Sequence, residues 1–252
     1  IFGIMNSINV YAFTYDNGKI WYSTDTGFYS RSFNVQRYYD GRLIRTTYLN
    51  GYLTYLKVDD KEYPIGNFSD NGASQIKDGI KITLNLSTVS GGTYVKVEYT
   101  VENIDSITKT ISIATGAHVM LGSNFNTYVG PLPTVNGKDR GIIISEYGRE
   151  PTFSFVLRNA YGVTNVSTYW YGNMGEDWVD YKYRQVTHSA TFDRNACVAW
   201  SWKDKSIAPG KTQKYSVLLG YGQLNNPPTI NVTSGVKNTY YRGEVVNIQG
   251  TV

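Results

Sequence analysis

The sequence predicts an all-β fold, a large antiparallel two-sheet β-sandwich, and two observations support that prediction. Apolar and polar side chains alternate residue by residue along several runs, which is the pattern of a strand with one buried face. Asn-Gly and Asp-Gly pairs separate many of these runs, and such pairs supply the positive φ that tight hairpin turns require. We find no run with helical periodicity, so an antiparallel all-β fold with many strands is expected. The first part of the chain, about sixty residues, is expected to form consecutive hairpins rather than alternating strands and helices.

The clearest hairpin is expected between residues 80 and 102. Apolar side chains occupy every second position of 80–86 and again of 95–101, with polar residues between them. Ser90, Gly91 and Gly92 separate the two runs with a turn signal. We therefore expect two antiparallel strands that share one wet face and one face on the core.

Tight turns are expected at five dipeptides, each made of Asn or Asp followed by Gly. These are Asn17-Gly18, Asp40-Gly41, Asn50-Gly51, Asn71-Gly72 and Asn136-Gly137.

The composition predicts an ordered core and argues against some classes of partner. Hydrophobic residues make up 41% and charged residues 17% of the 252 residues, a balance typical of a folded chain and not of a disordered one. The 23 tyrosines far outnumber the 9 phenylalanines, and tyrosine suits half-buried sheet faces and wet contact surfaces. The net charge of +4 is scattered without a basic run, so no nucleic acid is expected. No run reaches the roughly 20 apolar residues of a membrane helix.

Three segments are predicted along the chain. Residues 1–222 form the sandwich, residues 223–228 with Pro227 and Pro228 form a linker, and residues 229–252 form a short strand pair. Two strands alone are marginal in water, so this pair is expected to pack on the body, pair with another chain or belong to a longer module. The start at Ile1 without a signal-peptide pattern is expected for a mature or excised segment.

Two parts of the chain resemble known families. The body resembles galactose-mutarotase-like supersandwich domains of large extracellular surface proteins, in residues 94–103, 109–113, 117–122, 199–202, 207–210 and 215–220. The segments 226–230 and 245–250 are similar to the opening strands of bacterial Ig-like or cadherin-like repeats. The resemblance implies a supersandwich followed by an incomplete Ig-like segment, at the cell surface or outside the cell. Some relatives bind or act on carbohydrate, but the mutarotase His and Glu contexts have no match here.

The histidines and the single cysteine are expected to have structural roles. His118 and His188 lack a second histidine or a carboxylate at ligand spacing, so we predict neither a metal site nor a general base. Cys197 lies in an apolar run and is expected to be buried. No metal, cofactor or catalytic residue is predicted.

The densest aromatic and acidic stretch, residues 169–183, is the candidate carbohydrate site. Glycines at 172 and 175 suggest a loop, and sugars bind where aromatic faces lie beside carboxylates. The candidate residues are Trp170, Tyr171, Glu176, Asp177, Trp178 and Asp180. The alternative is that the aromatic rings cover one end of the sandwich while the acids face water. A Ca²⁺ site is not expected, because the spacing differs from that of an EF-hand loop.

Four Asn-X-Ser/Thr tripeptides are candidate N-glycosylation acceptors. They begin at Asn67, Asn85, Asn165 and Asn231. Asn85 falls on the polar face of its predicted strand, where a glycan would point into water.

These observations favour an extracellular structural or adhesive module of a cell-surface or filament-forming protein. Its partners would be neighbouring domains or copies of itself, and the C-terminal strands could assemble it by strand addition. The alternative is a carbohydrate-binding module that uses the aromatic and acidic loop and takes glycans as partners. An enzyme acting on polysaccharide is a third hypothesis, based only on analogy of fold.

Overall fold

The computed structural model confirms the all-β prediction. It describes residues 13–24, 31–48, 51–122, 127–146, 149–173, 178–185, 191–193, 196–224, 231–234 and 249–251. Every strand pairing in this part of the chain is antiparallel, and the sheets pack as a sandwich of several sheets. The helical elements of the described residues are the short η1 (Ser90–Gly92) and the four-residue α1 (Trp178–Tyr181).

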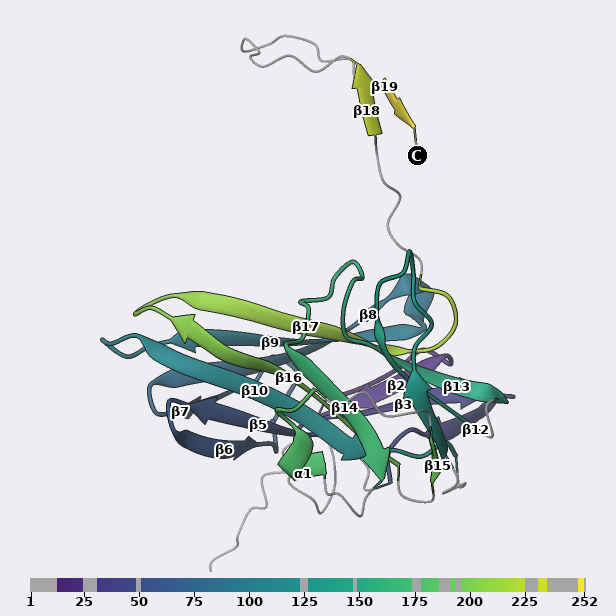
Figure 1. Ribbon diagram of the computed structural model, residues 1–252, viewed down its shortest axis with the longest axis horizontal. Helices are drawn as coiled ribbons and strands as arrows, with labels where there is room; N and C mark the ends of the chain where they lie inside the picture. Colours follow the sequence, from purple (N-terminus) through teal and green to yellow (C-terminus); the bar gives the residue numbers. More distant parts are fainter. Residues whose placement is uncertain are drawn as a thin grey trace, which may run out of the picture.

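The largest sheet has eight strands and forms one layer of the sandwich (Figure 1). Its order across the sheet is β15 (Thr191–Asp193), β11 (Thr127–Pro131), β12 (Gly141–Glu146), β13 (Arg149–Val156), β17 (Thr212–Gly220), β9 (Tyr94–Asn103), β8 (Ile80–Val89) and β7 (Ser74–Lys77).

A five-stranded sheet forms the facing layer. Its order is β14 (Thr168–Asn173), β16 (Ala196–Ile207), β10 (Lys109–His118), β5 (Leu53–Val58) and β6 (Lys61–Ile65). A four-stranded meander adds to the same core and consists of β1 (Thr14–Asp16), β2 (Ile20–Ser23), β3 (Asn34–Tyr39) and β4 (Arg42–Arg45).

One hydrophobic core lies between these sheets, and aromatic rings fill much of it. The ring of Trp200 on β16 lies 5.9 Å from that of Tyr52 and 6.0 Å from that of Phe155 on β13. A buried trio of hydroxyls crosses the core, where Tyr99 Oη on β9 lies 2.6 Å from Thr54 Oγ1 and 3.1 Å from Thr115 Oγ1 of the facing sheet. These hydrogen bonds let polar atoms sit in the core without leaving them unsatisfied.

The predicted hairpin is confirmed as β8 and β9, joined through η1. Ile80 pairs with Asn103 and Val89 with Tyr94, so the register runs without a slip along both strands. The apolar residues of 80–86 and 95–101 are buried, which confirms the alternation. Gly91 and Gly92 in the connection have φ of 66° and 83°, which explains the glycines there.

Four of the five predicted turns lie among the described residues and contain the expected positive φ. Between β3 and β4, Asp40 and Gly41 have φ of 48° and 70°. Asn136 and Gly137 have φ of 52° and 71°, while Gly18 and Gly72 have φ of 72° and 88°. Asn50 lies outside the described residues, and its neighbour Gly51 has φ of 148°.

The C-terminal segment contributes a separate two-stranded sheet. β18 (Asn231–Ser234) pairs antiparallel with β19 (Gln249–Thr251), and Figure 1 draws this pair apart from the sandwich. The predicted linker falls partly outside the described residues, so the division into three segments stays a prediction. In the part of the chain that is described, no helix has the length and apolar character needed to span a bilayer.

Candidate functional site

The aromatic side chains predicted to display a carbohydrate site are buried. Trp170 is 0% exposed, while Tyr171 and Trp178 are each 3% exposed. Trp170 stacks on Tyr181 of α1 with ring centroids 5.0 Å apart. These rings are therefore not displayed to solvent, and their burial agrees with the alternative interpretation, in which the aromatic rings cover the sandwich.

The burial of Trp178 has a specific cause in β10. A Cβ atom at Gly116 would lie 2.5 Å from the Trp178 ring, so the ring rests directly on the backbone of β10. With Trp170, Cys197 and Ala199, Trp178 forms a small second core on the five-stranded sheet.

The structure describes only one of the three acidic residues predicted for this site. Asp180 is exposed on α1, whereas Glu176 and Asp177 lie outside the described residues. Carbohydrate binding by this segment stays a prediction. The solvent-exposed aromatic rings that motivated it are absent from the described part of the segment.

The histidines and the cysteine lie as follows. His118 ends β10 and is half-buried opposite Cys197, and His188 lies outside the described residues. Cys197 is fully buried, as predicted. Among the described residues, no group of three or more His, Cys, Asp or Glu side chains is placed to hold a metal ion.

The candidate glycosylation sites lie mostly on accessible surface. Asn67 and Asn165 are exposed, and Asn85 is half-buried on β8. The side-chain oxygen of Asn165 accepts the Asn159 N–H at 2.8 Å. Asn231 begins β18, and its side chain lies outside the description.

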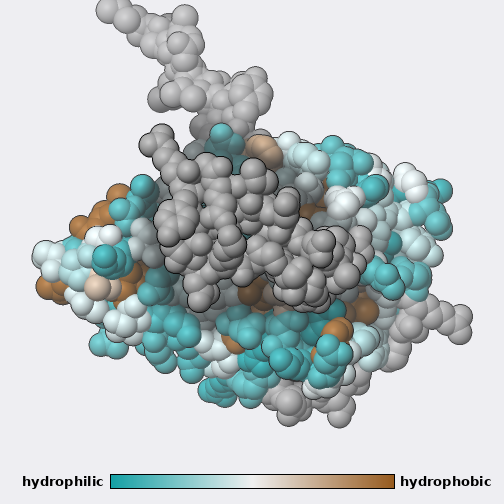
Figure 2. Space-filling view, turned by 90° about the horizontal axis from the view of Figure 1, so that it is seen from above, coloured by the Kyte–Doolittle hydropathy of each residue, from teal (hydrophilic) through white to brown (hydrophobic). Residues whose placement is uncertain are grey.

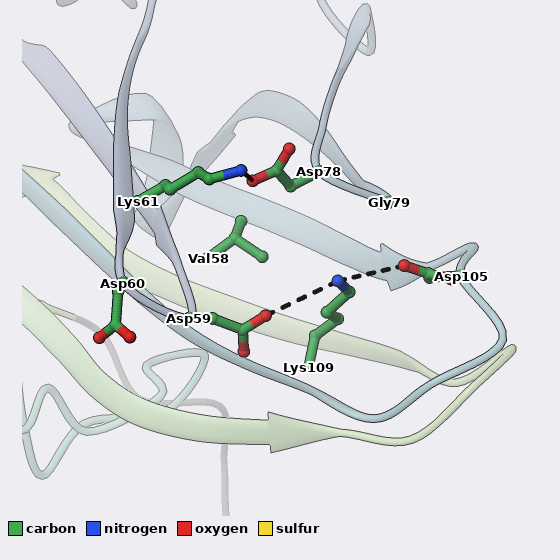
Figure 3. A pocket seen from close by; sticks show the side chains of 8 residues that line it. All are labelled: Val58, Asp59, Asp60, Lys61, Asp78, Gly79, Asp105 and Lys109. Carbon is green, nitrogen blue, oxygen red and sulfur yellow. Dashed lines mark ion pairs between the residues drawn. The ribbon is translucent and has the colours of Figure 1, made fainter.

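A charged cleft of about 550 Å³, here called the tip cleft, lies at one end of the sandwich (Figure 3). Three turns meet there: β5–β6, β7–β8 and β9–β10. Sheet register brings them together, because Val58 pairs with Ile111 and Ile80 with Asn103. The lining consists of Val58, Asp59, Asp60, Lys61, Asp78, Gly79, Asp105 and Lys109.

Ion pairs link the three turns across the tip cleft. Lys109 Nζ lies 3.1 Å from Asp105 Oδ2 and 3.6 Å from Asp59 Oδ2, so one lysine bridges two turns (Figure 3). Lys61 Nζ lies 3.4 Å from Asp78 Oδ2 and joins the third turn. Asp60 points away from these pairs in the same view.

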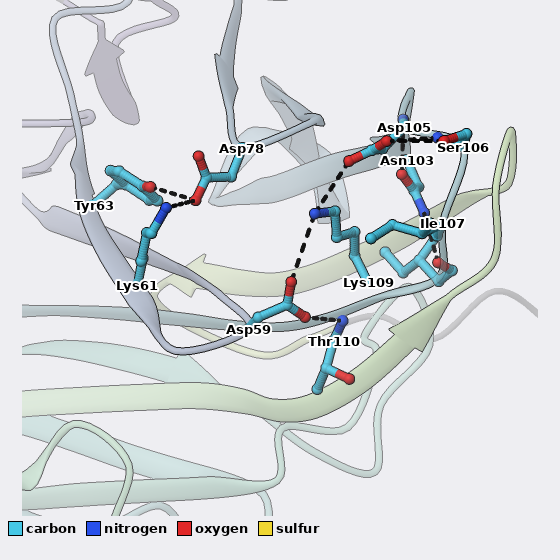
Figure 4. A network of polar contacts seen from close by, with 11 residues as sticks. Asp59, Lys61, Tyr63, Asp78, Asn103, Asp105, Ser106, Ile107, Lys109 and Thr110 are labelled. Carbon is cyan, nitrogen blue, oxygen red and sulfur yellow. Dashed lines mark hydrogen bonds and ion pairs between the residues drawn. The ribbon is translucent and has the colours of Figure 1, made fainter.

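Behind the ion pairs, buried Asn103 organises the backbone of the tip (Figure 4). Its side-chain amide donates to the carbonyls of Ile107 and Ile207, both at 2.8 Å. Its side-chain oxygen accepts the N–H of Asp105 at 2.9 Å. One buried side chain therefore fixes the β9–β10 turn and ties it to the end of β16.

The charges of the tip cleft are arranged for pairing, not for proton transfer. The hydrogen bond from Lys109 lowers the pKa of Asp105, with help from the Ser106 N–H. The Tyr63 hydroxyl, 2.6 Å away, lowers the pKa of Asp78, and Lys61 adds to that effect. These carboxylates are ionised near neutral pH, so neither holds the proton that a general acid must carry.

Replacing Lys109 with methionine is expected to destabilise the protein at pH 7 but not in acid. The Asp105 pKa is lowered from 3.8, so its contribution is present above that value and is lost as the pH falls through the lowered pKa. The Lys109 pKa is raised from 10.5, so its contribution is lost only above that value.

Urea unfolding at pH 7 and at about pH 2 measures this difference. We expect the midpoint of Lys109→Met to lie below that of the unmodified protein at pH 7 and to match it in acid. Lys211→Met, an exposed lysine in the turn that follows β16, is the control and should change neither midpoint. A midpoint difference that is equal at both pH values would contradict the ion-pair account.

Exposed isoleucines lie beside the tip cleft, and Figure 2 shows hydrophobic side chains at this end of the molecule. The tip isoleucines are Ile76 on β7, Ile104 and Ile107, with exposed fractions of 60%, 49% and 58%. Hydrogen bonds of the main chain fix the positions of Ile104 and Ile107. The Ile104 N–H donates to Gly79 O at 2.9 Å, and the Ile107 carbonyl accepts from the Asn103 side chain. Apolar side chains that gather in this way mark contact surfaces more often than isolated ones do.

Sequence reasoning did not identify the tip cleft or the tip isoleucines. The aspartates of the cleft occupy turns, where Asp is common because its side chain accepts hydrogen bonds from the nearby backbone. Their presence in the sequence therefore does not indicate a shared site. The signal that was available is the pair of isoleucines in the polar turn 104–108, because apolar residues are unusual there.

Comparison with known proteins finds no protein-family model that matches this chain, and no curated protein that matches its sequence.

Proposed function

We propose that the chain is an extracellular structural or adhesive module of a cell-surface or filament-forming protein. The observation that carries this proposal is the presentation of exposed Ile104 and Ile107 on a turn fixed by an ion pair and by Asn103. Rigid apolar side chains lose little conformational entropy on association, which favours a permanent contact. The resemblance of the body to domains of large surface proteins supports the same proposal.

The neighbour in this proposal is a second copy of the chain. Four aspartates and two lysines give the tip cleft a negative charge, whereas the whole chain carries +4, so the rest of the chain has a net positive charge. A copy that brings basic surface to the tip would meet complementary charge around an apolar centre. Strand addition through β18 and β19 is a second route by which copies could join.

Replacing Ile104 and Ile107 together with aspartate is expected to weaken self-association by about tenfold or more. Each substitution removes apolar contact area and adds negative charge to a surface that is already negative. Sedimentation velocity over a concentration series measures the association constant. Leu43→Asp, at an exposed apolar residue of β4, is the matched control and should associate as the unmodified chain does.

A truncated chain that ends at Leu224 separates the two routes. Loss of association on truncation, with no effect of the isoleucine substitutions, would assign assembly to the C-terminal strands. A chain that stays monomeric at every concentration would contradict self-association through either route.

A further inference from the structure

A second cavity, of about 630 Å³, lies on the outer side of the eight-stranded sheet, where the chain leaves β17. We call it the exit pocket. Ser154 of β13 pairs with Gly220 of β17, and Gly220 with Tyr94 of β9, so three neighbouring strands form its floor. Leu132, from the loop after β11, and Leu224, at the end of the described body, pack beside the floor and give it apolar walls.

Arg140 is the one charged side chain among the described residues that line the exit pocket. Its Nε is buried and makes no hydrogen bond to any described residue. The neighbouring carboxylate is engaged elsewhere, because Asp139 pairs with Arg158 at 3.2 Å and accepts the Tyr169 hydroxyl at 2.7 Å. A buried donor without an acceptor is unfavourable, so the Arg140 side chain has hydrogen-bonding capacity that the described residues do not use.

The positive charge of Arg140 acts on the neighbouring Tyr94 hydroxyl. Burial raises the pKa of Tyr94, while the Ser154 hydroxyl and the positive charge of Arg140 oppose that rise. The Tyr94 hydroxyl donates to the Gly222 carbonyl at 2.9 Å and holds the departing chain against the floor. The pocket wall is therefore fixed next to the guanidinium of Arg140.

These features define the chemistry of a ligand. A guanidinium presents a planar fork of N–H donors that matches a carboxylate. One arginine without a lysine or a second arginine suits a single negative charge more than a phosphate dianion, and the leucines and Val156 suit an apolar body. We propose that the exit pocket binds an organic carboxylate with a compact apolar body, its carboxylate on Arg140 and its body against Leu132, Val156 and Leu224.

The test uses benzoate and its neutral analogue benzamide as probes, with the full chain observed by NMR. Benzoate is expected to shift the Arg140 Nε–Hε signal and the amides of 222–224 saturably, and to bind at least about tenfold more tightly than benzamide. The Arg158 Nε–Hε, which already donates to the Val166 carbonyl at 3.0 Å, is the internal control and should not shift.

The variant Arg140→Met loses the Arg140 Nε–Hε signal and thereby assigns it. We expect this variant to give the amide spectrum of a folded protein and to bind no benzoate. Equal affinity for benzoate and benzamide, or benzoate binding that persists in Arg140→Met, would overturn the proposal, as would the absence of a saturable shift. The capped dipeptide acetyl-Asp-Phe-amide separates the sources of the carboxylate. Tighter binding than benzoate assigns the site to an acidic side chain of a polypeptide, and weaker binding assigns it to a free organic acid.

Discussion

Replacing Asn103 with leucine is expected to lower the free energy of unfolding by about 3 kcal/mol. Leucine fills a similar volume but leaves three backbone groups without their partner: the carbonyls of Ile107 and Ile207 and the N–H of Asp105. Asn103 is 0% exposed, so water does not replace these hydrogen bonds without opening the tip.

Urea unfolding gives the stability change, and amide hydrogen exchange shows where it acts. We expect faster exchange in 104–110 and little change in the distant β12 and β13. Asn85→Leu is the control, because Asn85 is half-buried on the neighbouring strand and its side chain makes no hydrogen bond to the described residues. A loss below about 1 kcal/mol in Asn103→Leu would contradict the role assigned to this side chain.

Replacing Arg37 with methionine is expected to cost about 2–3 kcal/mol. Arg37 on β3 is 5% exposed and attaches the four-stranded meander to the larger sheet. Its guanidinium donates to the Thr152 carbonyl, lies 3.2 Å from Glu150 Oε2 and lies 3.8 Å from the centre of the Tyr221 ring. Methionine keeps the packing of the aliphatic stem but removes all three contacts.

Two further variants locate the source of that cost. Glu150→Gln is expected to change stability by less than about 1 kcal/mol, because the Glu150 side chain is 58% exposed and water screens the ion pair. Arg45→Met, on the exposed side of β4, is the control and is expected to stay within about 0.5 kcal/mol. If Glu150→Gln cost as much as Arg37→Met, the ion pair and not the buried carbonyl and ring contacts would hold the meander.

The sequence predicted those parts of the fold that depend on local pattern. The alternation in 80–86 and 95–101 is visible because each strand buries one face, and the turn at Asp40 and Gly41 is visible because its backbone needs positive φ. The fold class follows from these local signals.

Features that depend on distant contacts were not predicted. Trp178 is buried because Gly116, far away in the sequence, leaves room for its ring on β10. The tip cleft exists because register aligns three separate turns, and alternation alone does not give register between strands distant in sequence. Arg140 stands out only when it is known that its Nε lacks a hydrogen-bond partner, and hydrogen-bond partners are known only from the folded chain.

Electron cryomicroscopy of the protein purified from its native source shows directly whether copies assemble through the tip isoleucines. We expect ordered filaments or arrays in which Ile104 and Ile107 lie within the contact between copies. Dispersed single particles at every concentration, or assemblies that leave the tip isoleucines in solvent, would contradict it.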